Sequence, residues 1–204
     1  MAATVDCWFD YASPFAYLGT TQIERVAKAA GAQVRFRPFL LGALFKAIGT
    51  PVVPLYAMPE AKQRYYRLEL ERWATRWRVP FRFSTRFPVR SVDALRVTLL
   101  APEPRRPALV AAIMRATWVE DRDLADPEVI RAACVEADVE PGLVERQADA
   151  RQRLVYETAE AQRLGVPGAP TFVVGSELFW GQDRLELVAD ALAGVVAPPL
   201  ELVP

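Results

Sequence analysis

The sequence predicts an α/β protein whose strands lie near its two ends and whose middle is helical. Residues 4–39 give a strand, a helical pattern and a second strand, whereas residues 170–194 give two strands and a helix. Between about 46 and 155 no segment has a convincing strand pattern. These observations predict that the two ends form one sheet, because neither end can bury a complete core alone.

The first unit begins with TVDCWFD (4–10), which is rich in the β-branched and aromatic residues that favour strands. A helical pattern follows over 14–30, with Pro14 at its first position and Gly31 after its end. AQVRFRPF (32–39) then alternates as a second strand. Because the crossover is helical, the two strands are expected to be parallel.

The middle of the chain is expected to be helical. After a proline-rich connection, GTPVVPLYAMPEAK (49–62), an amphipathic helix is predicted over 60–78, and an irregular connection over 79–91. Asp126-Pro127 and Glu140-Pro141 resemble an N-cap followed by proline at the first helical position. The further helices are expected at 92–101, 107–120, 127–137 and 141–164.

The last part returns to β structure. PTFVV (170–174) and ELFW (177–180) flank a two-residue turn and predict a hairpin. A helix is expected over 181–194, and the APP segment near the C-terminus suggests a frayed tail. The buried side of that helix is expected to carry Leu185, Val188, Ala189 and Leu192.

This order of elements predicts a thioredoxin-like fold with a large all-helical insertion. Residues 1–45 and 156–204 are expected to form the thioredoxin-like domain, and residues 46–155 the insertion. In such a fold, the reactive group lies in the turn between the first strand and the first helix, where helix N–H groups stabilise an anion.

Composition excludes several functional classes. The 204 residues are 52% hydrophobic, and 25 Lys and Arg balance 25 Asp and Glu, so a nucleic-acid partner is not expected. No apolar run reaches the roughly 18 residues of a membrane span, and no secretion signal is visible, so a cytoplasmic location is expected.

The chain contains no histidine, which excludes Ser-His-Asp and Cys-His catalysis and histidine-ligated metals. Its two cysteines, Cys7 and Cys134, lie far apart and are interpreted as free thiols, with no metal site expected. The chain therefore lacks the usual partners for nucleophilic or metal-dependent chemistry.

Ser13 stands where the first helix begins, in the tetrad Ser13-Pro14-Phe15-Ala16. It is a poor nucleophile because no nearby base would take its proton. Its hydroxyl can nevertheless donate a hydrogen bond to a thiolate brought by a ligand, which lowers the pKa of that thiol. The alternative is that Ser13 is an ordinary helix N-cap.

Two other segments could contribute to a site. Pro170 directly precedes an apolar strand, and a cis bond at Ala169-Pro170 would leave the preceding backbone free to pair with a peptide-like ligand. Asp183, at the start of the last helix, is either a helix cap or a carboxylate that holds an amino group, as in a γ-glutamyl end.

Four segments together resemble the 2-hydroxychromene-2-carboxylate isomerase family, which is related to kappa-class glutathione transferases and DsbA-type oxidoreductases. They are FDYASPFAYLG, RPFLLGALFKAIG, VPGAPTFVV and FWGQDRLELV, and the likeness extends over essentially the whole chain. The resemblance implies a glutathione-dependent isomerase in which glutathione acts catalytically on an aromatic-degradation intermediate.

By this resemblance, Ser13 would hold the glutathione sulfur as a thiolate, and Ala169, before a cis Pro170, would pair with the cysteinyl backbone. Gln182 and Asp183 would hold the γ-glutamyl end, with Trp180 and Gly181 beside it. Lys62 matches a lysine near the glycyl carboxylate, although a solvated helix lysine explains it equally well.

The residues implied for the substrate, a small aromatic carboxylate, are Lys46, Thr50 and Arg90. Gly49-Thr50 stands where the family commonly has Gly-Asn, and Arg90-Ser91 replaces an expected asparagine. Thr50 can still hydrogen-bond, and Arg90 suits either a carboxylate or an internal ion pair. Both departures leave the exact substrate open.

Two other functions stay open: a kappa-like transferase that releases a glutathione conjugate, and a non-catalytic thiol-binding module. Another low-molecular-weight thiol could also replace glutathione. The resemblance further implies a homodimer.

Overall fold

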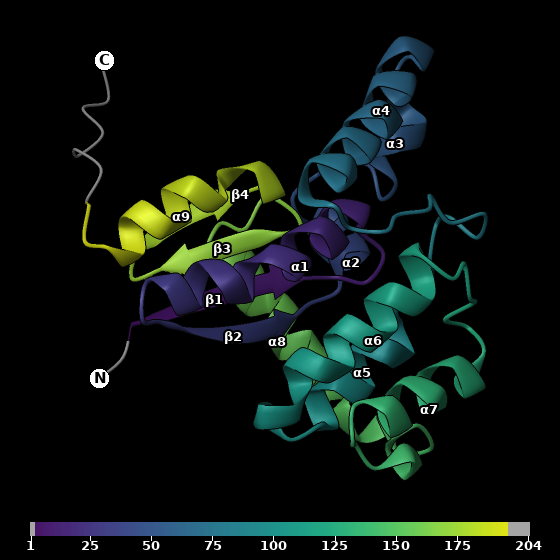
Figure 1. Cartoon of the computed structure of the whole chain (residues 1–204). Helices are drawn as coiled ribbons and strands as arrows, with labels where there is room; N and C mark the ends of the chain where they lie inside the picture. Colours follow the sequence, from purple (N-terminus) through teal and green to yellow (C-terminus); the bar gives the residue numbers. More distant parts are fainter. Residues whose placement is uncertain (1–2, 196–204) are drawn as a thin grey trace.

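A mixed four-stranded sheet forms the centre of the computed structural model, which describes residues 3–195 (Figure 1). The strand order is β2-β1-β3-β4. β1 pairs in parallel with β2 and antiparallel with β3, and β3 pairs antiparallel with β4. The strands are β1 (Thr4–Phe9), β2 (Gln33–Pro38), β3 (Thr171–Val174) and β4 (Glu177–Trp180).

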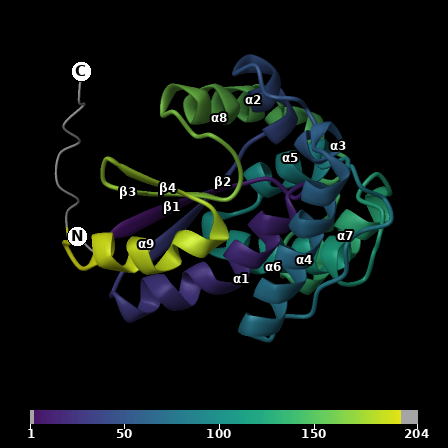
Figure 2. The ribbon, with the colours of Figure 1, turned by 90° about the horizontal axis from the view of Figure 1, so that it is seen from above.

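Helices cover both faces of this sheet. α1 (Pro14–Ala29) and α9 (Leu185–Leu192) lie on one face, and α8 (Arg151–Arg163) lies on the other (Figure 2). The predicted union of the two chain ends in one sheet is therefore confirmed, and with it the thioredoxin-like fold. The inserted helices are α2 (Leu41–Ala47), α3 (Pro54–Ala57), α4 (Glu60–Trp77), α5 (Val92–Leu100), α6 (Arg106–Trp118) and α7 (Pro127–Glu136).

Local signals account for several helix boundaries. Ser13 caps α1, Pro14 occupies its first position, and Gly31 after its end has a φ of +67°. At α7 the Asp126 carboxylate accepts a hydrogen bond from the Glu128 N–H at 2.9 Å, as an N-cap should. The irregular segment 79–91 is confirmed and contains a cis Phe87–Pro88 bond.

The prediction of a single helix over 141–164 is wrong. Two short 3₁₀ turns, Pro141–Leu143 and Gln147–Ala150, precede α8, and Glu140 makes no side-chain cap. The bends let Leu143 and Val144 become buried beside α7, whereas the following turn packs against α5. Tertiary packing therefore overrides the helical pattern.

The last helix also begins later than predicted. Gly181 has a φ of +111°, outside the helical region, and residues Gln182–Arg184 form a 3₁₀ turn before α9 starts at Leu185. Leu185 and Val188 are buried, while Ala189 and Leu192 are partly buried against the core. The short helices α2 and α3 were not predicted, and the APP tail lies outside the described residues.

Residues 46–155, all of which are described, contain no strand. α2 and α8 nevertheless cross the expected limits of this segment and pack against each other. The division into two domains stays a prediction. None of the helices within residues 3–195 combines the length and apolar character needed to cross a membrane.

Candidate active site

Ser13 lies at the N-terminus of α1, directly after the turn that leaves β1. Its side chain is buried, and its Oγ accepts a hydrogen bond from the Ala16 N–H at 3.1 Å. The same hydroxyl donates to the carbonyl oxygen of Ala169 at 2.8 Å. The N-cap interpretation is thus correct, and the hydroxyl proton also joins the turn after β1 to the loop before the neighbouring strand β3.

Asp10 fixes the turn that carries Ser13. Its carboxylate accepts hydrogen bonds from the backbone N–H groups of Ala12 at 2.9 Å and Leu41 at 2.8 Å. Burial raises the pKa of Asp10, although these two N–H groups and the Ser91 hydroxyl act in the opposite direction. Because these donors satisfy the hydrogen-bonding capacity of the carboxylate, we interpret Asp10 as a structural residue that holds the turn against α2.

Tyr11 ties the same turn to the inserted helices. Its hydroxyl lies 2.6 Å from the Thr98 hydroxyl on α5, and its carbonyl accepts a hydrogen bond from Trp118 Nε1 on α6 at 2.9 Å. All three side chains are buried. The position of Ser13 is consequently set by the helical segment as well as by the sheet.

The Ala169–Pro170 peptide bond is cis, the form that the resemblance implies. Pro170 packs closely on α1, where a Cβ at Gly19 would lie 3.0 Å from Pro170 Cγ. The Ala169 N–H makes no hydrogen bond within the described residues, and neither does the Phe15 N–H at the start of α1. Two backbone donors are therefore available beside the Ser13 hydroxyl.

The turn after β4 forms another wall. The Gly181 N–H donates to the Pro170 carbonyl at 3.0 Å, which places this turn beside the cis bond. Gln182 is 6% exposed, yet its amide makes no hydrogen bond within residues 3–195. Asp183 makes no cap, so the cap prediction is wrong; its carboxylate instead pairs with Arg184 at 2.9 Å.

Trp180 closes this wall on its outer side. Trp180 is 57% exposed, and its Nε1 would lie 2.8 Å from a Cβ at Gly168, so the indole packs directly on the Gly168 backbone. A larger residue at 168 would therefore push the indole outward.

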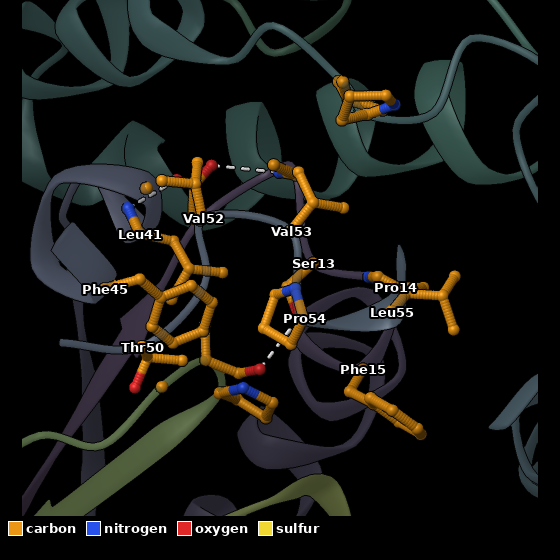
Figure 3. Close-up of a pocket in the computed structure, with 18 of the residues that line it drawn as sticks. Ser13, Pro14, Phe15, Leu41, Phe45, Thr50, Val52, Val53, Pro54 and Leu55 are labelled. Carbon is orange, nitrogen blue, oxygen red and sulfur yellow. Dashed lines mark hydrogen bonds between the residues drawn. The ribbon is translucent and has the colours of Figure 1, made fainter. Parts of the chain in front are cut away.

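The Ser13 turn, the cis-proline loop and the turn after β4 line one cavity of about 830 Å³. It contains Ser13, Ala169, Pro170 and the predicted residues Trp180, Gly181, Gln182 and Asp183, together with Thr50 and Arg90. Its remaining wall is largely apolar. Figure 3 shows this wall beside Ser13, where the side chains of Phe45, Val52, Val53, Pro54 and Leu55 gather.

Two predicted residues lie apart from the cavity lining. Lys46, near the end of α2, and Lys62, in the first turn of α4, are both exposed. Arg90 lines the cavity and forms no ion pair within the described residues, which favours the ligand interpretation over an internal ion pair. The roles of all three in binding stay predictions.

The sequence reasoning missed the part of the cavity that α4 provides. Tyr66, Glu69 and Trp73 line it at helical spacing, and Phe15 meets Tyr66 edge-on with ring centroids 4.7 Å apart. The amphipathic pattern of α4 was visible, but such a pattern does not distinguish a cavity wall from a packed core.

The thiols of the chain do not take part in this site. Both cysteines are free and buried, and burial raises the pKa of Cys134 to about 11 and raises that of Cys7 further. Neither lines the cavity. Among residues 3–195, no group of three or more His, Cys, Asp and Glu side chains could hold a metal ion. Any reactive thiol at Ser13 must come from a ligand.

The sheet, the cis-proline loop and the helix N-terminus that meet at Ser13 define a thioredoxin-type site without a cysteine. The chain belongs to the family described as the DSBA-like thioredoxin domain, which matches residues 4–193.

Within that family, the chain is similar to two groups of enzymes, which are named as isomerases and as glutathione transferases. It is 28% identical over 202 residues to a 2-hydroxychromene-2-carboxylate isomerase of Sphingobium xenophagum, covering 94% of this chain and 99% of the relative. It is also 28% identical over 208 residues to glutathione S-transferase kappa 1 of Homo sapiens, covering 93% and 90%. The relatives thus support isomerase activity in the family.

Solved structures agree with the fold. A 2-hydroxychromene-2-carboxylate isomerase superposes with a TM-score of 0.81 at 25% identity, covering 94% of this chain and 95% of the other. A cytosolic disulfide reductase of Pseudomonas aeruginosa, whose structure was determined with GSH, has a TM-score of 0.63 at 22% identity, covering 94% and 96%. The second likeness concerns the fold alone.

Proposed function

We propose that this protein is a glutathione-dependent isomerase that acts on 2-hydroxychromene-2-carboxylate or a related aromatic-degradation intermediate. The observation that carries the proposal is the single cavity in which Ser13, the cis-proline loop and residues 181–183 face a large apolar wall. Such a cavity has room for both a tripeptide thiol and a ring-containing substrate. The isomerases named above are similar over almost their full length.

The free polar groups of the cavity fit glutathione. The Ala169 N–H is available for the cysteinyl backbone, and the Gln182 amide, which lines the cavity and has no partner within residues 3–195, suits the γ-glutamyl end. Asp183 would accept from the γ-glutamyl amino group, with Trp180 and Gly181 forming the adjacent wall. Lys62 is proposed to bind the glycyl carboxylate. Because Lys62 is exposed and does not line the cavity, this contact would lie at the rim of the cavity.

When bound, glutathione would supply a thiolate for reversible addition to the conjugated substrate; with the hemiketal ring open, the carbon–carbon bond that has become single could rotate before the thiolate is eliminated to give the trans product. Ser13 would stabilise that thiolate with its hydroxyl proton, aided by the N-terminus of α1. To do so, the hydroxyl must leave the Ala169 carbonyl, which then becomes free to accept from a ligand amide. Ser13 can keep accepting from the Ala16 N–H throughout, because it has two lone pairs.

The apolar wall would hold the aromatic ring of the substrate. Arg90, a cavity cation without an ion pair in the described part, would bind the carboxylate, and the Thr50 hydroxyl would add a hydrogen bond. Lys46 is proposed as a second group for the carboxylate, from the exposed side of α2.

The test is turnover with glutathione far below the substrate concentration. An isomerase converts all the substrate to the trans product and leaves free glutathione unchanged, as measured by chromatography and thiol titration. Stoichiometric loss of glutathione into a conjugate would instead favour a kappa-like transferase, the second candidate, which the similarity to the human kappa enzyme supports. Tight binding of glutathione in calorimetry without turnover of any tested substrate would favour a thiol-binding module.

The homodimer and the cytoplasmic location stay predictions. Light scattering of the purified protein tests the first, because a dimer has twice the mass of the 22.8 kDa chain.

A further inference from the structure

The α4 side of the cavity contains a phenol for which the proposed function has no role. Tyr66 lies on the face of α4 that also carries Glu69 and Trp73, and all three line the cavity. The Tyr66 ring is held in place edge-on against Phe15, two residues after Ser13, with an interplanar angle of 74°. Its orientation is therefore tied to the turn that carries Ser13.

The Tyr66 hydroxyl is free to bind a ligand. It makes no hydrogen bond within the described residues, and it is not among the buried polar atoms that are sealed from solvent. Burial of the phenol raises its pKa, so the group stays protonated over the physiological range. A neutral phenol in a largely apolar cavity is a hydrogen-bond donor whose natural partner is an oxygen atom.

The charges around the cavity indicate which ligand oxygen would face this donor. Glu69 lies one turn beyond Tyr66 on α4 and is paired with Arg72 at 2.7 Å, and none of the α4 residues that line the cavity is a cation that could attract a ligand carboxylate. Arg90, on a different segment of the wall, attracts one. A ligand that directs its carboxylate toward Arg90 therefore presents a neutral carbonyl or ring oxygen to α4.

We infer that Tyr66 is a further catalytic residue, which donates a hydrogen bond to the carbonyl oxygen of a conjugated ring substrate. The inference rests on the proposed function. Negative charge develops on such an oxygen when a nucleophile adds to the conjugated system, and a preorganised donor in a largely apolar cavity stabilises that charge. Tyr66 thereby complements Ser13: one hydroxyl serves the nucleophile and the other serves the electrophile.

The first test compares Tyr66→Phe with Tyr65→Phe. Tyr65 is the adjacent tyrosine on α4, is 58% exposed and does not line the cavity, so it is a matched control. We expect Tyr66→Phe to lower kcat about 100-fold, as removal of one such donor does, while the Kd for glutathione stays unchanged. Tyr65→Phe should keep wild-type turnover, and equal turnover in both variants would overturn the inference.

The second test does not depend on turnover. Coumarin-3-carboxylate, which has a ring carbonyl and a carboxylate but no bond to isomerise, is added to each protein, and the carbonyl stretch is recorded by difference infrared spectroscopy. A hydrogen bond from Tyr66 lowers this frequency in the wild type and in Tyr65→Phe, and its loss in Tyr66→Phe raises it.

Equal frequencies in the three proteins, or no binding of the probe to the wild type, would overturn the inference. If the frequency shifts as expected but no protein isomerises the substrate, the donor role of Tyr66 stands and the proposed function fails.

Discussion

Ser13→Ala removes two hydrogen bonds of different kinds, so its effects on stability and on chemistry can be separated. The substitution deletes the N-cap bond from the Ala16 N–H and the bond to the Ala169 carbonyl, which is itself buried. Loss of the cap costs about 1 kcal/mol, and loss of the second bond costs about 1 kcal/mol more. We therefore expect the free energy of unfolding to fall by about 2 kcal/mol.

Asp126→Ala is the matched control, because it removes a helix cap far from the cavity. The Asp126 carboxylate accepts one hydrogen bond, from the Glu128 N–H, and the side chain is exposed. Its loss should cost about 1 kcal/mol and leave turnover unchanged. Urea unfolding followed by circular dichroism measures both values under the same conditions.

The chemical effect is expected for Ser13→Ala alone. A hydrogen bond to a charged group is worth about 1.5–3 kcal/mol, so isomerisation should slow about 10- to 100-fold or more. If Ser13→Ala is no less stable than Asp126→Ala, the hydrogen bond to Ala169 contributes nothing. If turnover is unchanged, the assignment of Ser13 to the thiolate is wrong.

Three further substitutions test other parts of the structure. In Gly181→Ala, the new Cβ would lie 2.5 Å from Asp183 Oδ1, on a residue whose φ is +111°. We expect the free energy of unfolding to fall by about 1–3 kcal/mol and glutathione to bind more weakly in calorimetry. Wild-type stability and wild-type affinity for glutathione would contradict the assignment of this turn to the cavity wall. Arg90→Gln should raise the KM for the carboxylate substrate about 5- to 10-fold without changing the Kd for glutathione; an unchanged KM would exclude Arg90 from the substrate site. Hydrogen bonds from Thr85 lower the pKa of Asp121 from 3.8, so its stabilising effect is present above that value and is lost as the pH falls through the lowered pKa. The difference in unfolding free energy between wild type and Asp121→Asn should therefore shrink as the pH falls below about 4, and a difference that is independent of pH would refute the role of the carboxylate.

Local sequence signals predicted helix boundaries well where a residue type strongly favours one position in a helix. Proline after a capping side chain marked the starts of α1 and α7 correctly. Proline is favoured at the first helical position because the N–H group that it lacks would have no partner within the helix. The same signal failed at Glu140-Pro141, where the segment bends so that its apolar residues pack against two different helices. That choice depends on tertiary contacts, which a local pattern does not contain.

The candidate site was predictable only in part. The predicted fold places the turn after β1 beside the segment before β3. In the structure they meet: the Ser13 Oγ lies 2.8 Å from the Ala169 carbonyl oxygen, although the two residues are 156 positions apart in the chain. The resemblance supplied residues 180–183, and the structure places them in the same cavity. The contribution of α4 required coordinates, because Tyr66 and Trp73 have the spacing of core residues.

The cavity is built from two kinds of segment with different chemical character. The sheet side contributes Ser13, the cis-proline loop and residues 181–183, which offer hydrogen-bonding groups suited to a peptide thiol. The inserted segment contributes the aromatic and aliphatic wall together with Tyr66 on α4 and Arg90 in the irregular connection before α5. Both departures from the family pattern, at Thr50 and at Arg90-Ser91, lie on the second side. Under the proposed function, substrate choice should therefore depend on residues 46–92, whereas binding of the thiol should depend mainly on the sheet side. Asp10 and Tyr11 hold the Ser13 turn through the backbone of Leu41 and through Thr98 and Trp118. None of these is a proposed substrate-binding residue, so substitutions at Thr50 or Arg90 should leave the Ser13 turn in place.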